Sequence, residues 1–167
     1  MKPEAIVKAL AGVYTLVNTT NSRDGVPGPP NEPGRWKGFL VYTNTGYVSV
    51  SMTSYTLADL PNNGAGLIWP PPSDPSLDAG WTVVGKAVLT YAGPFSIDPA
   101  YPATKDFGGV IHGPLDLMSA PMLVGTLQRR NYTVVREKGK NGGVYLSLIV
   151  SQPDRGLQSV IWWRKVD

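Results

Sequence analysis

Cysteine is absent from this 167-residue chain, and histidine occurs only once, as His112. Without cysteine the chain has no disulfide bond, no thiolate nucleophile and no cysteine-ligated metal site. One histidine cannot build a site of several imidazoles, and no close carboxylate cluster takes its place. The sequence therefore predicts a protein without a bound metal.

Long hydrophobic runs and phosphate-binding motifs are also missing. No apolar segment approaches the roughly 20 residues of a membrane helix. The apolar N-terminal stretch is interrupted by Lys8 and lacks the cleavage site of a signal peptide. The glycine clusters at 64–66 and 141–143 do not connect a strand to a helix, as a phosphate-binding loop does. We expect a cytoplasmic protein that uses no cofactor and makes no membrane contact.

Basic residues exceed acidic residues by only 15 to 12, and they are scattered along the chain. The longest basic clusters are the pairs Arg129-Arg130 and Arg164-Lys165. A nucleic-acid-binding surface needs a concentrated basic patch or stripe, usually with a recognisable motif. We therefore expect no nucleic-acid partner.

Turn residues and short apolar runs are what the sequence does contain. The 19 glycines and 16 prolines separate runs rich in Val, Tyr, Thr and Trp, a pattern typical of all-β proteins. Hydrophobic residues make up 42% of the chain, which is enough to bury a core. The length fits a single domain over residues 1–167.

The N-terminal residues predict a short helix followed by a strand. Pro3 suits the first turn of a helix over 3–12, which would cover one end of a barrel. In the strand that follows, over 12–19, period-two alternation places Tyr14 and Asn18 on one face.

A hairpin is predicted over 35–43 and 47–54, because Gly46 supplies the positive φ that a short turn requires. The proline-rich segment 55–80 predicts a loop that contains Trp69.

The second half of the chain predicts one ambiguous segment and five more strands. Apolar residues over 78–91 recur at helical spacing after Asp78, but Val83, Val84 and Val88 also permit a strand. The five strands are expected over 92–98, 107–118, 123–136, 144–151 and 156–166. For 123–136 a bend or break near Gly125 is the alternative to one continuous strand. About eight antiparallel strands result, the number at which a closed barrel has room for one small ligand.

Several segments, taken in chain order, carry a resemblance to a known family. They are LAGVYTLVN, KGFLVYTNTGYVSVSM, TYAGPFSID, GVIHGPLDL, LVGTLQRR and VIWWRK. Together they resemble the small lipocalin-like domain proteins of bacteria and fungi, with Tyr14 in place of the usual first-strand Trp and Lys37 in place of the usual Arg. The resemblance implies a lipocalin-like β-barrel with a hydrophobic cavity. Some fungal members are cofactor-free cyclases or Diels-Alder-type enzymes of natural-product pathways, whereas others only carry ligands.

His112 is the first candidate catalytic residue. Period-two spacing places Asp116 on the same face of its strand, and a His-Asp pair can shuttle or donate a proton. The alternative is a structural histidine, because Pro114 lies between the two residues and would bend the strand.

Arg129 and Arg130 should point to opposite faces of their strand, so at most one faces the interior. An inward guanidinium would hold a carboxylate, an enolate or a polarised carbonyl, and Arg129 is the third candidate catalytic residue. The alternative is a solvated or ion-paired arginine. The resemblance also implies that Arg164 stacks on Tyr14.

Aromatic and methionine side chains are the expected lining of the cavity. Adjacent Trp162 and Trp163 must face opposite sides of a strand, so one of them lines the interior. The candidate ligand-binding residues are Tyr14, Phe39, Tyr47, Met52, Trp69, Trp81, Tyr91, Met118, Met122 and Trp163. Ordinary core packing is the alternative role for each.

Two main functions remain open. The first is a cofactor-independent cyclase or isomerase that folds a polyketide- or terpenoid-like substrate inside the barrel, in secondary-metabolite biosynthesis. The second is a non-catalytic carrier or sensor of a small hydrophobic ligand. A scaffold that acts through protein contacts is a third possibility, and the fold alone does not decide among them.

Overall fold

The computed structural model describes residues 1–28, 36–54, 60–64, 67, 76, 78–139 and 142–166. Its strands are β1 (Gly12–Arg23), β2 (Val26–Pro27), β3 (Lys37–Tyr42), β4 (Tyr47–Thr53), β5 (Val88–Ile97), β6 (Phe107–His112), β7 (Leu117–Met118), β8 (Gln128–Arg136), β9 (Val144–Gln152) and β10 (Leu157–Lys165). Its helices are α1 (Pro3–Leu10) and α2 (Asp78–Ala87), with short 3-10 turns η2 (Pro61–Gly64), η4 (Pro121–Leu123) and η5 (Pro153–Arg155).

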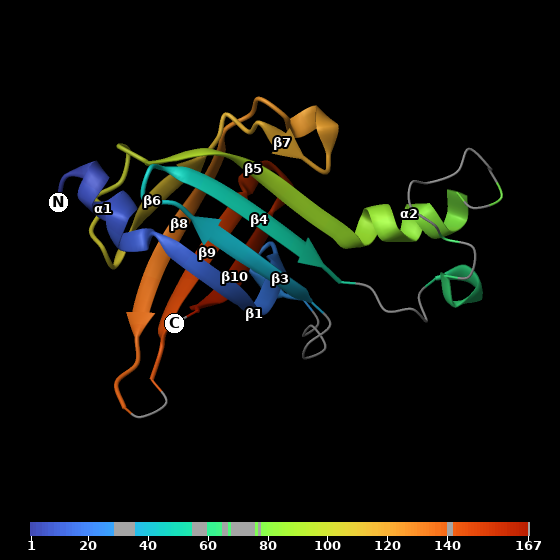
Figure 1. Ribbon diagram of the computed structural model, residues 1–167, viewed down its shortest axis with the longest axis horizontal. Coiled ribbons are helices and arrows are strands. Elements are labelled where there is room, and N and C mark those ends of the chain that lie inside the picture. Colours follow the sequence, from blue (N-terminus) through green and yellow to red (C-terminus); the bar gives the residue numbers. More distant parts are fainter. Residues whose placement is uncertain are drawn as a thin grey trace.

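Eight of the strands form a closed antiparallel barrel (Figure 1). Their order is β1-β3-β4-β5-β6-β8-β9-β10, and β10 pairs back onto β1 to close the ring. The short strands β2 and β7 add to β1 and β5 outside this ring. The predicted barrel of about eight strands with a short N-terminal helix is confirmed.

The predicted hairpin consists of β3 and β4, and Gly46 in its turn has φ of 84°. Side chains alternate strictly between the two faces of both strands. Leu40 on β3 and Val48 on β4 are fully buried, whereas Phe39 and Tyr47 point outward and are 46% and 40% exposed. Two expected cavity-lining residues, Phe39 and Tyr47, therefore lie on the outer surface of the barrel.

The ambiguous segment 78–91 contains both of its predicted structures in succession. Helix α2 ends at Ala87, and β5 begins at Val88. The strand expected over 107–118 is divided into β6 and β7, and β8 begins only at Gln128. Trp69 and most of the predicted loop around it lie outside the described residues.

Strand β1 changes its inward face at a bulge between Leu16 and Asn18. Tyr14, before the bulge, is 2% exposed; after it Thr19 is buried and Asn18 is exposed. An extra residue in one strand shifts its alternation by one position. The expectation that Asn18 shares the face of Tyr14 is therefore wrong.

Helix α1 closes one end of the barrel, as its apolar face predicted. Ile6 and Leu10 are buried against the core. The Tyr14 hydroxyl donates to the Leu10 carbonyl at 2.7 Å, and the Lys165 ammonium donates to the Ala11 carbonyl at 2.6 Å. The last carbonyls of a helix have no donors within the helix, so these two side chains hold its C-terminus in place.

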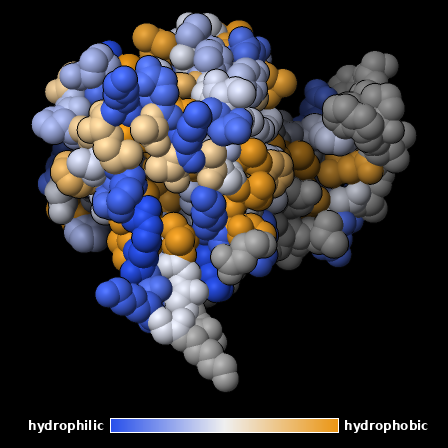
Figure 2. Space-filling view, turned by 60° about the vertical axis from the view of Figure 1, so that its left-hand side comes forward, coloured by the Kyte–Doolittle hydropathy of each residue, from blue (hydrophilic) through white to orange (hydrophobic). Residues whose placement is uncertain are grey.

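The outer surface of the barrel is mixed. Figure 2 shows one face of it as a mosaic of hydrophilic and hydrophobic side chains. Val13, Val17 and Phe39, on β1 and β3, are among the large hydrophobic residues that are about half exposed.

Candidate functional site

His112 is the centre of a buried polar cluster inside the barrel. It is the last residue of β6 and is 0% exposed. Its Nε2 atom lies 2.7 Å from the hydroxyl oxygen of Tyr42 on β3, and its Nδ1 atom lies 3.0 Å from that of Tyr91 on β5. Phe95 packs edge-on against the imidazole. We call Tyr42, His112 and Tyr91 the Tyr-His-Tyr cluster.

Burial sets the protonation state of this cluster. It lowers the pKa of His112 well below its usual value, and the positive charge of Arg130 lowers it further, so the imidazole is neutral and carries one N–H. Burial also raises the pKa of both tyrosines, which keep their hydroxyl protons at neutral pH. A neutral imidazole offers one donor and one acceptor, so the two tyrosines must differ in their roles.

The two distances indicate which tyrosine donates. O–H donors normally lie about 2.7–2.8 Å from their acceptor and N–H donors about 2.9–3.0 Å. The shorter contact fits Tyr42 as donor to Nε2, and the longer one fits Nδ1–H as donor to Tyr91, so this is the tautomer that we propose. In this tautomer the hydroxyl hydrogen of Tyr91 remains available for another acceptor.

Arg130 is the arginine of the adjacent pair that faces the interior. Its guanidinium lies 5.6 Å from the centre of the Tyr91 ring. Burial is the largest effect on the pKa of Tyr91 and raises it, whereas the charge of Arg130 and a side-chain hydrogen bond from Arg130 lower it. Among the residues that the structure describes, no carboxylate forms an ion pair with Arg130. A cation therefore lies beside the Tyr-His-Tyr cluster without a counter-ion from the described chain.

Arg129, the arginine predicted as catalytic, points to the outside. It forms an ion pair with Asp98, and its side chain is 59% exposed whereas that of Asp98 is 2% exposed. Burial alone would raise the pKa of Asp98, but the Ala100 N–H and Arg129 outweigh burial and lower it. The structure thus places Arg129 in a surface ion pair, away from His112.

His112 and Asp116 are not brought together. Strand β6 ends at His112, so the alternation does not continue to Asp116. The Asp116 carboxylate instead accepts a hydrogen bond of 2.7 Å from the Tyr47 hydroxyl at the surface. The predicted shared face of His112 and Asp116 is therefore wrong, whereas the burial of His112 agrees with its position in the strand.

Lys165, and not Arg164, lies over Tyr14. The Lys165 ammonium is 5.7 Å from the centre of the Tyr14 ring. Alternation in β10 turns Trp163 and Lys165 inward and leaves Arg164 exposed. The expected stacking of Arg164 on Tyr14 is therefore wrong by one position.

The remaining candidate ligand-binding residues occupy different environments. Trp163 is buried in the core, and its indole N–H has no hydrogen-bond acceptor among the described residues. Met52 faces inward at 5% exposure, and Met118 packs against the core beside Tyr91. Trp81 lies on α2, and Met122 on η4 is 78% exposed.

Partly buried side chains lie at the end of the barrel opposite α1. Because α1 precedes β1, it covers the end at which β5 and β8 finish, and the opposite end is where they begin. Inward-facing side chains there are only partly buried: Trp36, Leu89, Arg130 and Ile161. We call this end, defined by these four residues, the mouth.

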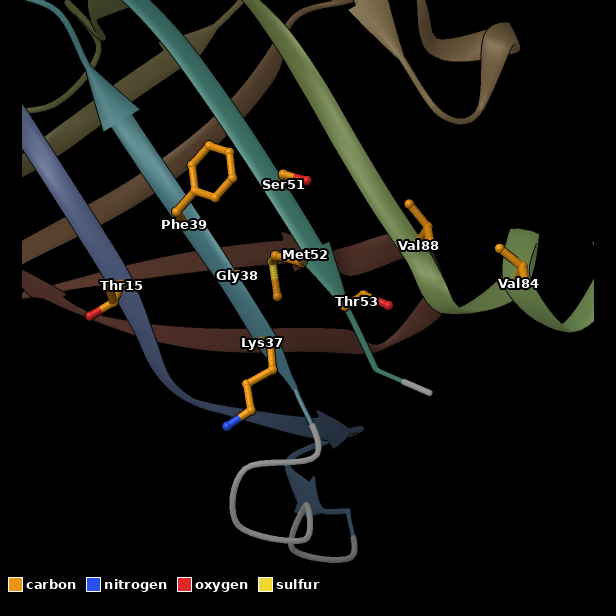
Figure 3. A pocket seen from close by; sticks show the side chains of 9 residues that line it. All are labelled: Thr15, Lys37, Gly38, Phe39, Ser51, Met52, Thr53, Val84 and Val88. Atoms are coloured by element: carbon orange, nitrogen blue, oxygen red, sulfur yellow. The ribbon is translucent and has the colours of Figure 1, made fainter. Parts of the chain in front are cut away.

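A pocket among the described residues lies outside the barrel (Figure 3). Its volume is about 860 Å³, and side chains of β1, β3, β4, β5 and α2 line it. Lys37, Phe39 and Thr53 contribute from the outer faces of β3 and β4. We call this the outer pocket.

Tyr42 is not among the residues predicted from the sequence, and Arg130 faces inward in place of the predicted Arg129. Tyr42 shares its face with buried Leu40 on a predicted hairpin, so its inward direction was accessible from alternation. Its contact with His112 was not, because 70 residues separate the two.

The described residues include neither a metal-binding cluster nor a membrane-spanning helix. No group of three or more His, Asp or Glu side chains there is close enough to hold a metal ion. No helix there is long and apolar enough to cross a membrane.

Comparison with known proteins identifies the family. A family model described as a lipocalin-like domain matches residues 11–166. No curated protein and no solved structure matches the chain significantly. The family match spans nearly the whole chain, and the closed barrel agrees with it. The chain therefore belongs to the lipocalin-like domain family.

Proposed function

We propose that the barrel binds a small, largely apolar organic molecule through the mouth and holds an oxygen atom of that molecule with Arg130 and Tyr91. One observation carries the proposal: an inward guanidinium that forms no ion pair with a described carboxylate lies beside Tyr91, whose hydroxyl hydrogen is available in the proposed tautomer. In an apolar environment such donors bind a carbonyl or enolate oxygen strongly. Membership of the lipocalin-like family supports ligand binding in general.

The activity that this arrangement suits best is a cofactor-independent cyclisation or isomerisation of a polyketide- or terpenoid-like substrate. In a Diels-Alder-type closure, three carbon-carbon double bonds become one, two carbon-carbon single bonds form, and no atom leaves. Donors on a carbonyl next to the alkene withdraw electron density and lower the barrier, while the barrel holds the two ends of the substrate close together. In the proposed tautomer, His112 supports Tyr91 by donating to its oxygen.

A carrier or sensor is the second candidate function. The observation in its favour is that both ring nitrogens of His112 are already hydrogen-bonded and that the ring is fully buried. A histidine in this state serves as a rigid polar support and need not exchange protons with a ligand.

The binding step is tested with two neutral fluorophores. Prodan, a dimethylaminonaphthalene with a propionyl carbonyl, is compared with N-phenylnaphthylamine, which has no carbonyl. We expect Arg130→Met to raise the Kd of Prodan about tenfold or more, because a hydrogen bond to a charged group contributes about 1.5–3 kcal/mol. N-phenylnaphthylamine should be affected far less.

Arg129→Met is the matched control, since it makes the same change one residue away on the outer face. It should leave the Kd of Prodan unchanged. Equal losses for the two arginine variants, or for the two fluorophores, would contradict the proposed role of Arg130.

The reaction is tested with a linear trienone in which a diene and an enone are joined by a short saturated linker. The enzyme hypothesis expects faster conversion to the cyclic isomer of equal mass, and a product ratio that differs from the buffer control. Tyr91→Phe should slow that conversion. Binding of the trienone with a product ratio equal to the control would reject the enzyme and support the carrier.

A further inference from the structure

We propose that the outer pocket is a second binding site, for an amphipathic molecule with a carboxylate head and a hydrocarbon tail. The pocket lies on the opposite side of the sheet from the Tyr-His-Tyr cluster. Phe39 and Thr53 line it and alternate along their strands with the buried residues Leu40 and Met52. Its volume of about 860 Å³ falls within the range of about 300–1,000 Å³ that is usual for small-molecule sites.

The positive charge of Lys37 selects the head group. Lys37 is the one charged residue among the described residues that line the pocket, and it forms no ion pair with a described carboxylate. A single ammonium balances the single charge of a carboxylate. A phosphate carries more charge and more acceptor oxygens, and for these the described pocket offers no second cation.

A second polar group in the pocket also lacks a partner. Thr53 lies directly opposite Lys37 in the β3–β4 ladder. Its hydroxyl is buried and forms no hydrogen bond with any described residue. Figure 3 shows Thr53 on β4, between Lys37 on β3 and Val88 on β5. A carboxylate oxygen beside Lys37 would give this hydroxyl the partner that buried polar groups require.

Apolar side chains provide the surface for the tail. Phe39 is 46% exposed, and Val84 of α2 and Val88 of β5 line the side of the pocket away from Lys37 (Figure 3). Gly38 and Met52 also line the pocket, and a Cβ atom at Gly38 would lie 2.8 Å from the Met52 Cγ atom. Methionine is flexible and adapts its shape to an irregular apolar ligand.

The end of a strand ladder explains why the pocket forms here. Strand β1 pairs with β3 only from Gly12–Tyr42 to Thr15–Phe39. Lys37 and Gly38 lie beyond the last pair and have no partner on β1. The wall of the barrel is therefore not continued by β1 at this point, and the outer pocket occupies the site.

The test uses dodecanoate as the probe and the methionine methyl groups as reporters in NMR spectra. The chain has four methionines, of which Met52 lines the outer pocket, Met118 packs near Tyr91, and Met122 is exposed. Below its micelle concentration, dodecanoate should shift the Met52 methyl signal and leave Met118 and Met122 in place. Dodecanol, which lacks the charge, should bind more weakly.

Three variants distinguish the contribution of the carboxylate head of the ligand from that of its hydrocarbon tail. Lys37→Gln should raise the Kd of dodecanoate about fivefold, the upper range for an exposed charge pair, and should not affect dodecanol. Lys8→Gln removes the same charge from a different pocket, beside α1, and should change neither Kd. Val88→Thr, which keeps a β-branched side chain in the strand, should weaken both probes.

Dodecanoate shifts at Met118 without shifts at Met52 would overturn the proposal, as would equal effects of Lys37→Gln and Lys8→Gln. The proposal stands apart from the proposed function of the interior. Arg130→Met should weaken Prodan and leave the Met52 response to dodecanoate intact, so the two proposals fail by different measurements.

Discussion

The two ends of the barrel are built in different ways. At the α1 end, Leu10 and Ile6 fill the opening, and side chains of β1 and β10 hydrogen-bond to the last carbonyls of the helix. At the mouth, inward side chains such as Leu89 and Ile161 are only partly buried, and the inward cation Arg130 lacks a described counter-ion.

This difference indicates that the α1 end contributes mainly to stability and that the mouth is the end available for the proposed binding. A tightly packed end contributes to the free energy of folding through its buried apolar contacts and through the hydrogen bonds that Tyr14 and Lys165 make to the end of α1. At the mouth, the partly exposed apolar groups and a cation without a described counter-ion would gain contacts from the ligand that we propose. Substitutions at the two ends should therefore change different measured quantities.

The largest effect should come from the α1 end. Leu10→Ala removes a side chain that is 1% exposed, and the lost contacts and resulting cavity should lower the free energy of unfolding by about 2–5 kcal/mol. Urea unfolding followed by Trp fluorescence measures it. The Kd of Prodan for the folded variant should not change; a parallel loss of Prodan binding would show that the two ends are not independent.

Tyr42→Phe acts between the two ends, in the Tyr-His-Tyr cluster. It removes the donor to Nε2 of His112 and leaves a buried acceptor unpaired, which should cost about 1–3 kcal/mol in urea unfolding. Tyr91→Phe should weaken Prodan more than Tyr42→Phe does, because only Tyr91 has a free hydroxyl hydrogen. Equal effects of the two variants on Prodan would contradict the assigned tautomer.

The pH dependence of stability should identify His112 directly, since it is the only histidine. Its pKa is lowered in the folded state, so below about pH 6.5 the unfolded chain binds one proton more than the folded chain. The free energy of unfolding should then fall by about 1.4 kcal/mol for each pH unit as the pH decreases toward the folded-state pKa. Above about pH 6.5 this contribution is fully present.

His112→Gln is the control for this measurement. Asp98 and Asp106 also have lowered pKa values, but their carboxyls titrate in the unfolded chain only near pH 3.9. Between about pH 6.5 and pH 5 the slope therefore belongs to His112. An unchanged slope in His112→Gln would mean that another group titrates in this range.

The smallest effect should come from Arg129→Met. This outer ion pair has one highly exposed partner, and pairs of that kind contribute up to about 1 kcal/mol. Thermal unfolding measures the change. A decrease of several kcal/mol in the free energy of unfolding would mean that the buried Asp98 carboxylate is costly without its partner. The ion pair would then be a second stabilising site, far from α1.

The sequence was informative wherever one local rule decided the structure. The β3–β4 hairpin followed from Gly46 and strict alternation, and the opposite faces of Trp162 and Trp163 followed from adjacency. Local rules failed where alternation was interrupted or its starting phase was unknown. Because of the bulge in β1, Thr19 faces inward in the place expected for Asn18. In β8, the alternation begins so that Arg130, and not Arg129, faces inward.

The candidate site itself was only partly predictable. Alternation indicates the face of His112, but not which side chains meet it across a closed barrel. Those partners, Tyr42 and Tyr91, come from strands that are 70 and 21 residues away along the chain. Such contacts depend on the stagger of the strands around the barrel, which no single segment encodes.

The ladder between β1 and β10 has a consequence for how the protein is made. It runs from Tyr14–Lys165 to Arg23–Leu157 and joins the first strand to the last. During synthesis, β1 must wait with one side unpaired until all the other strands have left the ribosome. Closure of the ring is thus the latest step available to the nascent chain, and its long sequence separation makes that step slow.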